Sequence, residues 1–372
     1  MKLINRLIAF IVIFSFCSGM FHIIANADST LNVSAKSACI IDADSKKVLY
    51  SKNASKRMPM ASTTKVMTAI IALESNIPLN KVIVVPKEAI GIEGSSIYLS
   101  EGEKITFEAL LYALLLSSAN DAAIAISIIV GGNTDNFVAL MNQKATLLGL
   151  TNTHFTNPHG LYDENHYTTA LDLAFLMAYA VKNPTFVEIS GCPKKVFPKQ
   201  DEGVRVMINH NKLLNTYDGI IAGKTGFTKK SGRCLVTSAS RNNLNLITVT
   251  LGAPDDWNDH KSLYDFVFSN YKRVIFEPIS VDFSVIGGKK DNVKAVANNE
   301  ISLLLPQNAE IKHIIKAPRF LFAEVKKGEA IGRVVYIYNG KEIASSPLLA
   351  CESVQKIRYR FNLFEFLKEL LF

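Results

Sequence analysis

Three short strings carry residue types that together could cleave an amide bond next to a free carboxylate. In chain order they are Ser62-Thr63-Thr64-Lys65, Ser118-Ala119-Asn120 and Lys224-Thr225-Gly226. They supply a serine nucleophile, two candidate bases, an amide holder and a cationic group for a carboxylate. Ser62 and Lys65 are three residues apart, so on a helix they share one face and their side chains can touch. Each string alone is weak evidence, and their order and spacing make the signal specific.

The first two strings would activate the serine nucleophile and protonate the leaving amine. A serine hydroxyl is a weak nucleophile at neutral pH, so Ser62 needs a base. Lys65 can take its proton if burial or a second cation, which we expect to be Lys224, lowers its pKa. The hydroxyl of Ser118 could relay a proton to the leaving amine. Asn120 could hold a substrate amide, because its side chain is both donor and acceptor.

The third string would recognise the substrate carboxylate. Lys224 offers charge and Thr225 a hydroxyl, while Gly226 lets a backbone approach where a side chain would block it. Each string also has a purely structural interpretation. Ser62 could be a helix cap, the second string could cap the following helix, and K-T-G could end a strand in an ordinary turn.

Apolar periodicity predicts the elements that position these strings. We expect a hairpin over 37–50 and an antiparallel pair of strands over 234–239 and 244–251. We also expect helices over 62–76, 106–116, 121–130, 169–181 and 261–271. The second string would then lie between two helices, and the third on or beside an edge strand. This pattern predicts an α/β (α+β) domain in which helices flank an antiparallel sheet.

The texture of the sequence changes near Phe276. From there to about Val354, short apolar runs alternate with Gly, Asn and Pro, which is typical of a small all-β domain. The predicted organisation is therefore an export signal over 1–27, a catalytic domain over 28–275, a β-sandwich domain over 276–357 and a terminal segment over 358–372.

The N-terminus predicts export. Lys2 and Arg6 precede the apolar run from Leu7 to Phe16, and Ala25-Asn26-Ala27 resembles a small-x-small cleavage site. The alternative is an uncleaved N-terminal anchor. Cys17 follows Phe16 rather than a small residue, which argues against a lipoprotein attachment site.

The last fifteen residues would form a helix with a broad apolar face. Arg358 and Arg360 come just before eight large apolar residues, a pattern that predicts an amphipathic helix lying on an acidic membrane surface. The alternative is a terminal helix docked on the protein's own core. The segment is too short to span a bilayer.

The composition limits the classes of binding partner that suit this chain. Removing Lys2 and Arg6 from the 41 basic residues leaves 39 against 33 acidic ones, a net charge of +6 that suits the anionic cell envelope. No nucleic-acid motif is present.

The four cysteines of the mature chain are scattered and form no disulfide framework: Cys39, Cys192, Cys234 and Cys351. We expect Cys39 and Cys234 to be buried. His159, Asp163 and His166 lack an established metal spacing, so we interpret them as loop residues and expect no metal and no cofactor.

The three strings resemble those of the low-molecular-mass penicillin-binding proteins, the serine-type D-alanyl-D-alanine carboxypeptidases of peptidase family S11. Longer stretches narrow the match: Ile41-Asp42-Ala43-Asp44, Met60 to Thr68, Leu115 to Ala123 and His166 to Ala170. The resemblance runs from about Ser37 to the C-terminus. It implies a β-lactamase/transpeptidase-like fold at the outer face of the cytoplasmic membrane or in the cell wall.

The resemblance also implies a mechanism. Ser62 would be acylated by the penultimate D-Ala of a peptidoglycan pentapeptide stem, terminal D-Ala would leave, and the backbone N–H groups of Ser62 and Phe227 would form the oxyanion hole. β-Lactam antibiotics would be covalent inhibitors. Some relatives carry histidine where this chain has Phe227, which puts a side-chain role in deacylation in doubt.

Two other functions compete with this one. Serine β-lactamases share the three strings, but they usually need an added glutamate in an E-x-x-L-N-like stretch, and the region around Glu164 lacks it. A catalytically idle penicillin-binding sensor or scaffold is the third hypothesis. Nothing in the sequence favours it, because every reactive group is intact.

Overall fold

The computed structural model describes residues 31–199, 203–297 and 300–358. The predicted export signal over 1–27 and nearly all of the predicted terminal helix lie outside these residues. The described chain divides into two compact units, with the boundary between Ser269 and Asn270. Each unit is described by itself.

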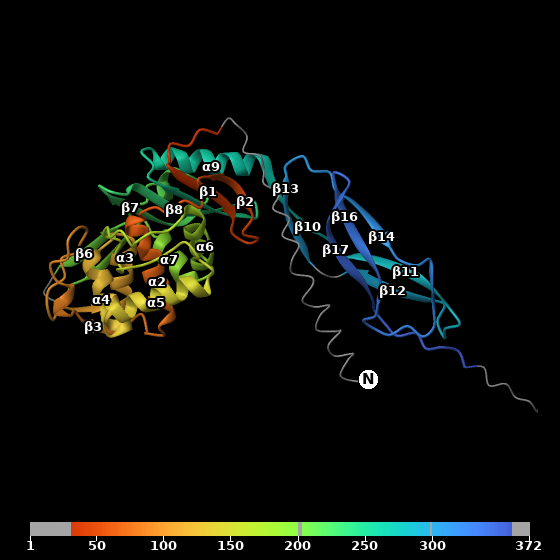
Figure 1. The fold of residues 1–372 in the computed structure, drawn as a ribbon. Helices are drawn as coiled ribbons and strands as arrows, with labels where there is room; N and C mark the ends of the chain where they lie inside the picture. Colours follow the sequence, from red (N-terminus) through yellow and green to blue (C-terminus); the bar gives the residue numbers. More distant parts are fainter. Residues whose placement is uncertain (1–30, 200–202, 298–299, 359–372) are drawn as a thin grey trace, which may run out of the picture. The chain divides into compact units, whose positions relative to one another are not determined.

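The N-terminal unit contains a five-stranded sheet, two small two-stranded sheets and the helices of the described residues (Figure 1). Its strands are β1 Ser37–Asp42, β2 Val48–Lys52, β3 Val82–Val84, β4 Lys104–Thr106, β5 Lys194–Pro198, β6 Val204–Ile208, β7 Ile220–Thr228, β8 Gly232–Arg241 and β9 Leu244–Leu251. Its helices are η1 Ala61–Thr64, α2 Lys65–Glu74, η2 Lys87–Ala89, α3 Phe107–Leu115, α4 Asn120–Gly131, α5 Thr134–Leu147, α6 Ala170–Ala180, α7 Pro184–Gly191, α8 Leu213–Thr216 and α9 Asp256–Asn270.

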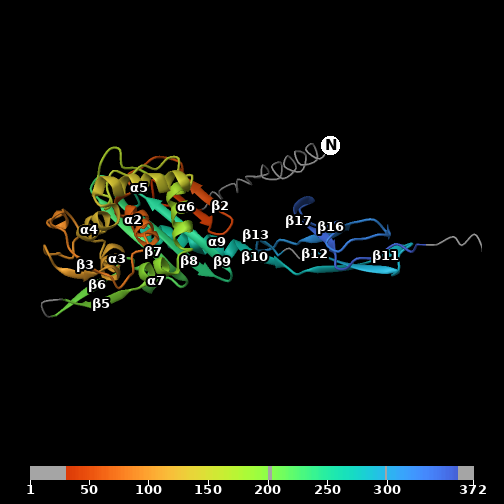
Figure 2. The same ribbon diagram turned by 90° about the horizontal axis from the view of Figure 1, so that it is seen from below.

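The main sheet is antiparallel in the order β2-β1-β9-β8-β7, so β7 is an edge strand, as the sequence predicts. Every residue of β1 and nearly all of β9 are buried, as expected for strands covered on both faces. Helix α9 covers one face, and α6 and α2 lie on the other side (Figures 1 and 2). The fold is therefore the predicted antiparallel sheet flanked by helices.

Most predicted helices are confirmed, with shifted ends. The Thr169 side chain caps α6 by accepting a hydrogen bond from the Asp172 N–H, as its position before an apolar repeat predicts. Helix α9 begins at Asp256, five residues before the predicted start at 261. Its first turn carries Asp256 and Asp259, whose carboxylates suit a helix N-terminus but interrupt the apolar periodicity.

The region expected to be one helix from Ser62 is two elements. Residues 61–64 form a 3₁₀ turn, and the α-helix begins only at Lys65. The tighter turn places residues three apart directly above one another, which brings Lys65 over Ser62. The sequence analysis also did not identify α5, α7 or the β5–β6 hairpin.

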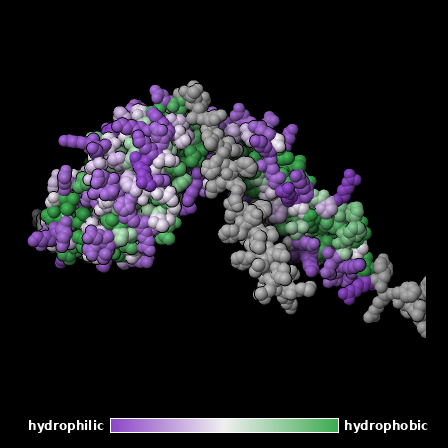
Figure 3. All heavy atoms as spheres, in the orientation of Figure 1, coloured by the Kyte–Doolittle hydropathy of each residue, from purple (hydrophilic) through white to green (hydrophobic). Residues whose placement is uncertain are grey.

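The C-terminal unit consists entirely of strands, as predicted. They are β10 Tyr271–Phe276, β11 Ile279–Ile286, β12 Asn292–Ala297, β13 Ile301–Pro306, β14 Lys312–Lys316, β15 Phe320–Phe322, β16 Ala330–Tyr338 and β17 Lys341–Ala350. Six form one sheet in the order β14-β16-β17-β12-β11-β15, around a small apolar core that includes Val293, Val334 and Leu348. Figure 3 shows that this unit also carries apolar side chains on its surface.

Among the described residues, no single helix is long and apolar enough to cross a membrane. Helices α4 and α5 would be long and apolar enough only if they formed one continuous helix, and the chain bends by 84° between them. The four described cysteines are free, and Cys39 and Cys234 are buried as expected. Burial raises the pKa of the Cys234 thiol to about 11.

His260 links α9 to the sheet, and its burial predicts that the N-terminal unit is sensitive to acid. Its ring nitrogens lie 2.8 Å from the Thr237 hydroxyl and 3.1 Å from the Thr250 hydroxyl, and burial lowers its pKa to about 3. Unfolding exposes this ring and restores a pKa of about 6.5. The unfolded chain therefore binds more protons below pH 6.5, and stability falls as the pH falls toward 3.

We expect the free energy of unfolding of this unit to fall between pH 6.5 and pH 4, with His260 contributing up to about 1.4 kcal/mol per pH unit. His260→Gln should make this fall shallower, because the non-titrating amide adds no proton. The free energy of unfolding at each pH is measured by urea unfolding, followed by the fluorescence of Trp257, the only tryptophan. The exposed His313→Gln is the control, and an unchanged slope in His260→Gln would contradict the assignment.

Candidate active site

The N-terminal unit brings the three strings together. Ser62 lies in η1 and Lys65 begins α2, while Ser118 precedes α4 and Asn120 is its first residue. The third string lies within the edge strand β7. Asn120 was expected in the connection or as a cap, but Ala119 occupies the cap position. The side chain of Asn120 is free to make contacts elsewhere.

The Lys65 amine is buried and surrounded by three oxygen atoms. Its Nζ lies 3.0 Å from Ser62 Oγ, 2.6 Å from Asn120 Oδ1 and 2.7 Å from the His159 carbonyl oxygen. The last two oxygens only accept hydrogen bonds, whereas a serine hydroxyl can also donate. A neutral Lys65 would therefore direct its two N–H bonds to Asn120 and His159 and its lone pair to the Ser62 proton. This is the geometry of a general base.

Burial and charge both favour the neutral amine. Removal from water lowers the pKa of Lys65 well below its ordinary value, the nearby Lys224 lowers it further, and the Asp121 carboxylate opposes both effects. The sequence analysis named burial and Lys224 as the two means of lowering this pKa. Burial is the larger of them.

Lys224 connects the second and third strings. Its Nζ donates to Ser118 Oγ at 3.0 Å and to the Thr225 carbonyl oxygen at 2.9 Å. The side chain is fully buried, and burial lowers its pKa to about 7. When Lys224 is protonated, Ser118 therefore lies against a cation, and its hydroxyl oxygen accepts from Lys224 while its own proton stays available for another group.

Asn120 holds Lys65 rather than standing open to a substrate. While Oδ1 accepts from Lys65, Nδ2 donates to the Glu93 carbonyl oxygen at 2.6 Å, and the backbone N–H donates to the Ser95 carbonyl oxygen at 2.7 Å. Both ends of the amide are thus engaged by the protein. In this arrangement Asn120 is a positioning residue for Lys65, in addition to the substrate contact predicted for it.

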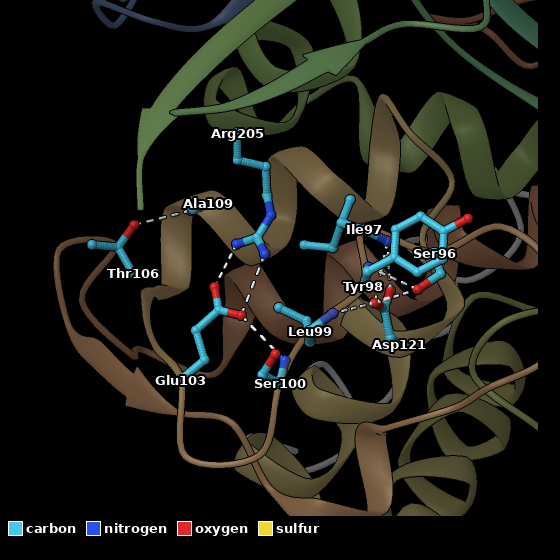
Figure 4. Close-up of polar contacts among 10 residues, drawn as sticks. All are labelled: Ser96, Ile97, Tyr98, Leu99, Ser100, Glu103, Thr106, Ala109, Asp121 and Arg205. Atoms are coloured by element: carbon cyan, nitrogen blue, oxygen red, sulfur yellow. Dashed lines mark hydrogen bonds and ion pairs between the residues drawn. The ribbon is translucent and has the colours of Figure 1, made fainter. Parts of the chain in front are cut away.

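The segment that contacts Asn120 is fixed by its neighbour in α4. Asp121 accepts hydrogen bonds from the Ser96 hydroxyl at 2.6 Å and from the N–H groups of Ile97 and Leu99, each at 3.1 Å (Figure 4). The same segment ends near a partly buried ion pair, in which Arg205 Nη1 lies 2.5 Å from Glu103 Oε1. Burial works against it, but the hydrogen bonds and charge of Arg205 hold the pKa of Glu103 below its usual value.

Two glycines let the backbone close around Ser62. A Cβ on Gly160 would lie 2.0 Å from the Ala61 carbonyl oxygen, and one on Gly226 would lie 2.9 Å from the Ser62 nitrogen. Gly226 therefore lets β7 lie against the turn that carries Ser62, besides the open approach predicted for a substrate. Phe227 follows with its side chain exposed. The predicted oxyanion hole, formed by the N–H groups of Ser62 and Phe227, remains a prediction.

The sequence analysis treated His159 and His166 as ordinary loop residues, but both support the site. His159 contributes its carbonyl oxygen to Lys65. His166 Nδ1 accepts from the Thr156 N–H at 3.0 Å, so its proton is on Nε2, which lies 2.8 Å from Thr64 Oγ1. Burial lowers the pKa of His166 to about 4, in keeping with a neutral ring. Among the described residues, no group of three or more His, Cys, Asp or Glu side chains could hold a metal ion.

The fold and the site define a penicillin-binding serine hydrolase. The chain belongs to the peptidase S11 family of D-alanyl-D-alanine carboxypeptidases, whose model matches residues 24–255, and residues 277–356 match the C-terminal domain of penicillin-binding protein 5. The protein is a serine-type D-alanyl-D-alanine carboxypeptidase.

Known relatives match this sequence along most of its length. The chain is 31% identical to the D-alanyl-D-alanine carboxypeptidase DacF of Bacillus subtilis, over 95% of each chain. It is 32% identical to DacC of Escherichia coli, over 87% of this chain and 85% of that one. The crystal structure of penicillin-binding protein 5 from Haemophilus influenzae superposes with a TM-score of 0.71 at 29% identity, covering 87% of this chain and 98% of that one.

The electrostatic coupling of the two lysines predicts a change in pH dependence. In Lys224→Met, Lys65 loses the cation that depresses its pKa, so its pKa should rise. Because the base must be unprotonated, the acidic limb of the kcat/KM profile should move to higher pH. The value of kcat/KM should also fall by about 10²-fold or more, since a buried charged partner is lost.

The measurement is D-Ala release from a D-Ala-D-Ala peptide as a function of pH. Lys230→Met, which removes a lysine from the exposed turn after β7, is the matched control and should leave the acidic limb in place. An acidic limb in Lys224→Met that coincides with the wild-type limb would show that the two lysines are not coupled.

Proposed function

We propose that the exported protein removes the terminal D-alanine from peptidoglycan pentapeptide stems through an acyl-enzyme on Ser62. The observation that carries this proposal is the position of Lys65 Nζ, 3.0 Å from Ser62 Oγ, with two acceptor-only oxygens taking its N–H bonds. That arrangement leaves the amine lone pair for one partner, the Ser62 proton.

The acylation step follows from these groups. Ser62 Oγ attacks the penultimate D-Ala carbonyl carbon while its proton passes to Lys65, and the developing oxyanion is held by the Ser62 and Phe227 N–H groups. The C–N bond breaks as the leaving nitrogen takes a proton through Ser118. Lys224 and Thr225 bind the carboxylate of the terminal D-Ala, and Gly226 keeps the strand open to it.

Deacylation reverses the roles. Water attacks the ester carbonyl carbon, Lys65 accepts a proton from that water, and Ser62 recovers its own proton as the C–O bond breaks. β-Lactams would acylate the same hydroxyl and, because their ring-opened leaving group stays attached, would remain as covalent inhibitors. No cofactor takes part in this scheme.

Ser62→Ala should abolish both covalent labelling by fluorescent penicillin and D-Ala release, with a loss of at least about 10⁴-fold in kcat. The mutant should keep its thermal unfolding temperature, since Ser62 is half-buried and the Lys65 amine keeps its hydrogen bonds to Asn120 and His159. Mass spectrometry of pentapeptide-bearing muropeptides checks the substrate directly. Ser75→Ala, at the other end of α2, is the control.

The outcomes separate the competing functions. Persistent labelling of Ser62→Ala would remove Ser62 as the nucleophile. Rapid turnover of the penicillin by the wild-type protein would indicate a β-lactamase, and stable labelling without D-Ala release would indicate a sensor. Stable labelling together with D-Ala release supports the carboxypeptidase mechanism.

We also propose that residues 358–372 anchor the protein at the outer face of the cytoplasmic membrane, after removal of the export signal over 1–27. The sequence carries this proposal: the apolar face of the segment follows Arg358 and Arg360. All three catalytic strings end by Gly226, so the chemistry should not depend on the anchor.

Phe364→Glu combined with Leu367→Glu should release the full-length mature protein from vesicles that contain anionic lipid, because the charges interrupt the apolar face. D-Ala release from a small soluble peptide should be unchanged. Binding of the wild-type protein should weaken with salt. Glu365→Gln, on the polar face, is the control. Full vesicle binding by the double variant would place the anchor elsewhere.

A further inference from the structure

One edge of the C-terminal unit exposes a cluster of large apolar side chains. Phe322 is 68% exposed, Ile286 49%, Phe320 47% and Ile357 38%. Exposed apolar residues scattered singly are ordinary, but a contiguous group on a soluble surface marks a contact site. We call these four residues the β15 patch.

The sheet pairing makes the patch contiguous. Strand β15 lies parallel to β11 at the end of the sheet, with Phe320 opposite Ser284 and Phe322 opposite Ile286. The rings of Phe320 and Phe322 meet edge to face with centroids 5.5 Å apart. Successive residues of a strand face opposite sides. Leu321, between the two rings, packs against the core instead.

The patch is bordered by basic side chains. Arg319 precedes Phe320, and Lys289 and Lys290 follow Ile286 in the turn to β12. The backbone of Lys356 pairs with that of Gly288 in an isolated antiparallel β-bridge, and Arg358 comes directly after Ile357. The carboxylates in these same segments are Asp291, Glu324 and Glu352, of which Glu352 pairs with Lys290. Five cations against three carboxylates leave the border positive. Figure 3 shows hydrophilic groups beside the apolar surface of this unit.

The end of the described chain leaves the unit at this patch. The Ile357 N–H donates to the Gly287 carbonyl oxygen at 2.9 Å, which fixes the exit point beside Ile286. Fourteen residues remain after Arg358, and most of them are large and apolar. The terminal segment therefore begins beside the patch.

We propose that the β15 patch is a second membrane-contact site, which places Phe320, Phe322, Ile286 and Ile357 among the headgroups of an anionic bilayer. Aromatic rings and aliphatic side chains partition into the headgroup boundary, and flanking lysines and arginines are attracted to acidic lipid. The inference goes beyond carboxypeptidase activity, and it uses the proposed terminal anchor only to bring the patch near the bilayer.

Two membrane contacts on one chain would act together. Once either the terminal segment or the patch is bound, the other is held at high effective concentration, so the combined affinity exceeds that of either alone. The unit would also be held at a defined angle to the membrane, because two contact points restrict rotation that a single contact point would allow.

The first test measures vesicle affinity with the full-length mature protein. Phe320→Ser combined with Phe322→Ser should weaken binding to vesicles of phosphatidylglycerol and phosphatidylcholine by about tenfold. The matched control is Ile314→Ser with Ile315→Ser on β14, at the opposite edge of the same sheet, where the side chains are 42% and 44% exposed. The control should bind like the wild type, and equal binding by both variants would overturn the proposal.

The second test locates the patch directly. Since Trp257 is the only tryptophan, a Trp257→Phe background allows Phe322→Trp to report from the patch alone. Vesicles with brominated acyl chains should quench the indole of Phe322→Trp and leave that of Ile314→Trp unaffected. Vesicle-bound protein without quenching at position 322 would overturn the proposal while leaving the terminal anchor intact.

The remaining outcomes are equally distinct. If the full-length protein binds no vesicle of any composition, both the patch contact and the terminal anchor are rejected. If sedimentation reveals a dimer that Phe320→Ser with Phe322→Ser dissociates, the patch belongs to a second copy of the chain and the membrane proposal fails. Penicillin labelling and D-Ala release, measured on the same samples, report separately on the proposed mechanism.

Discussion

The active site depends on one buried amine. Lys65 is fully buried, and an unpaired amine in that position would cost several kcal/mol. Its three oxygen partners come from the 3₁₀ turn, the start of α4 and the loop that carries His159. These segments must therefore fold together before the amine can be buried, and burial is the larger cause of its low pKa. Stability and reactivity have the same structural origin here.

Two residues near Lys65 have backbone conformations that are unfavourable in an unconstrained chain. Ala61 and Ser118, on either side of Lys65, have φ values of +48° and +57°, in the left-handed region that non-glycine residues rarely adopt. Such residues persist where the surrounding structure over-determines them. Ala61 packs closely against Gly160 and Gly226, and Ser118 lies between α3 and the buried first two turns of α4, so the surrounding packing supplies that support. The strain places the hydroxyls of the first two strings against the two lysines.

The part of the site that could be predicted from sequence consists of side chains. Ser62, Lys65, Ser118 and Lys224 are recognisable because their chemistry depends on residue type and spacing. The His159 carbonyl oxygen and the Glu93 carbonyl oxygen were missed, since any residue could provide them and no pattern marks them. The start of α9 was misplaced for a related reason: Asp256 and Asp259 are buried through polar contacts, which apolar periodicity does not detect. Local patterns thus predict elements well and tertiary polar contacts poorly.

The position of the third string at a sheet edge follows from what the chemistry needs. A strand inside a sheet has its backbone N–H and C=O groups paired on both sides, whereas β7 pairs with β8 on one side only. Exposed edges usually invite aggregation, and proteins tend to cover them. A Cβ on Gly226 would project from the face of β7 and lie 2.9 Å from the Ser62 nitrogen, so glycine lets this face of the strand lie against the turn that carries the nucleophile. We therefore expect the unpaired edge of β7 to be where a backbone N–H next to Lys224 could receive a substrate, a role that a central strand carrying the same K-T-G string could not perform.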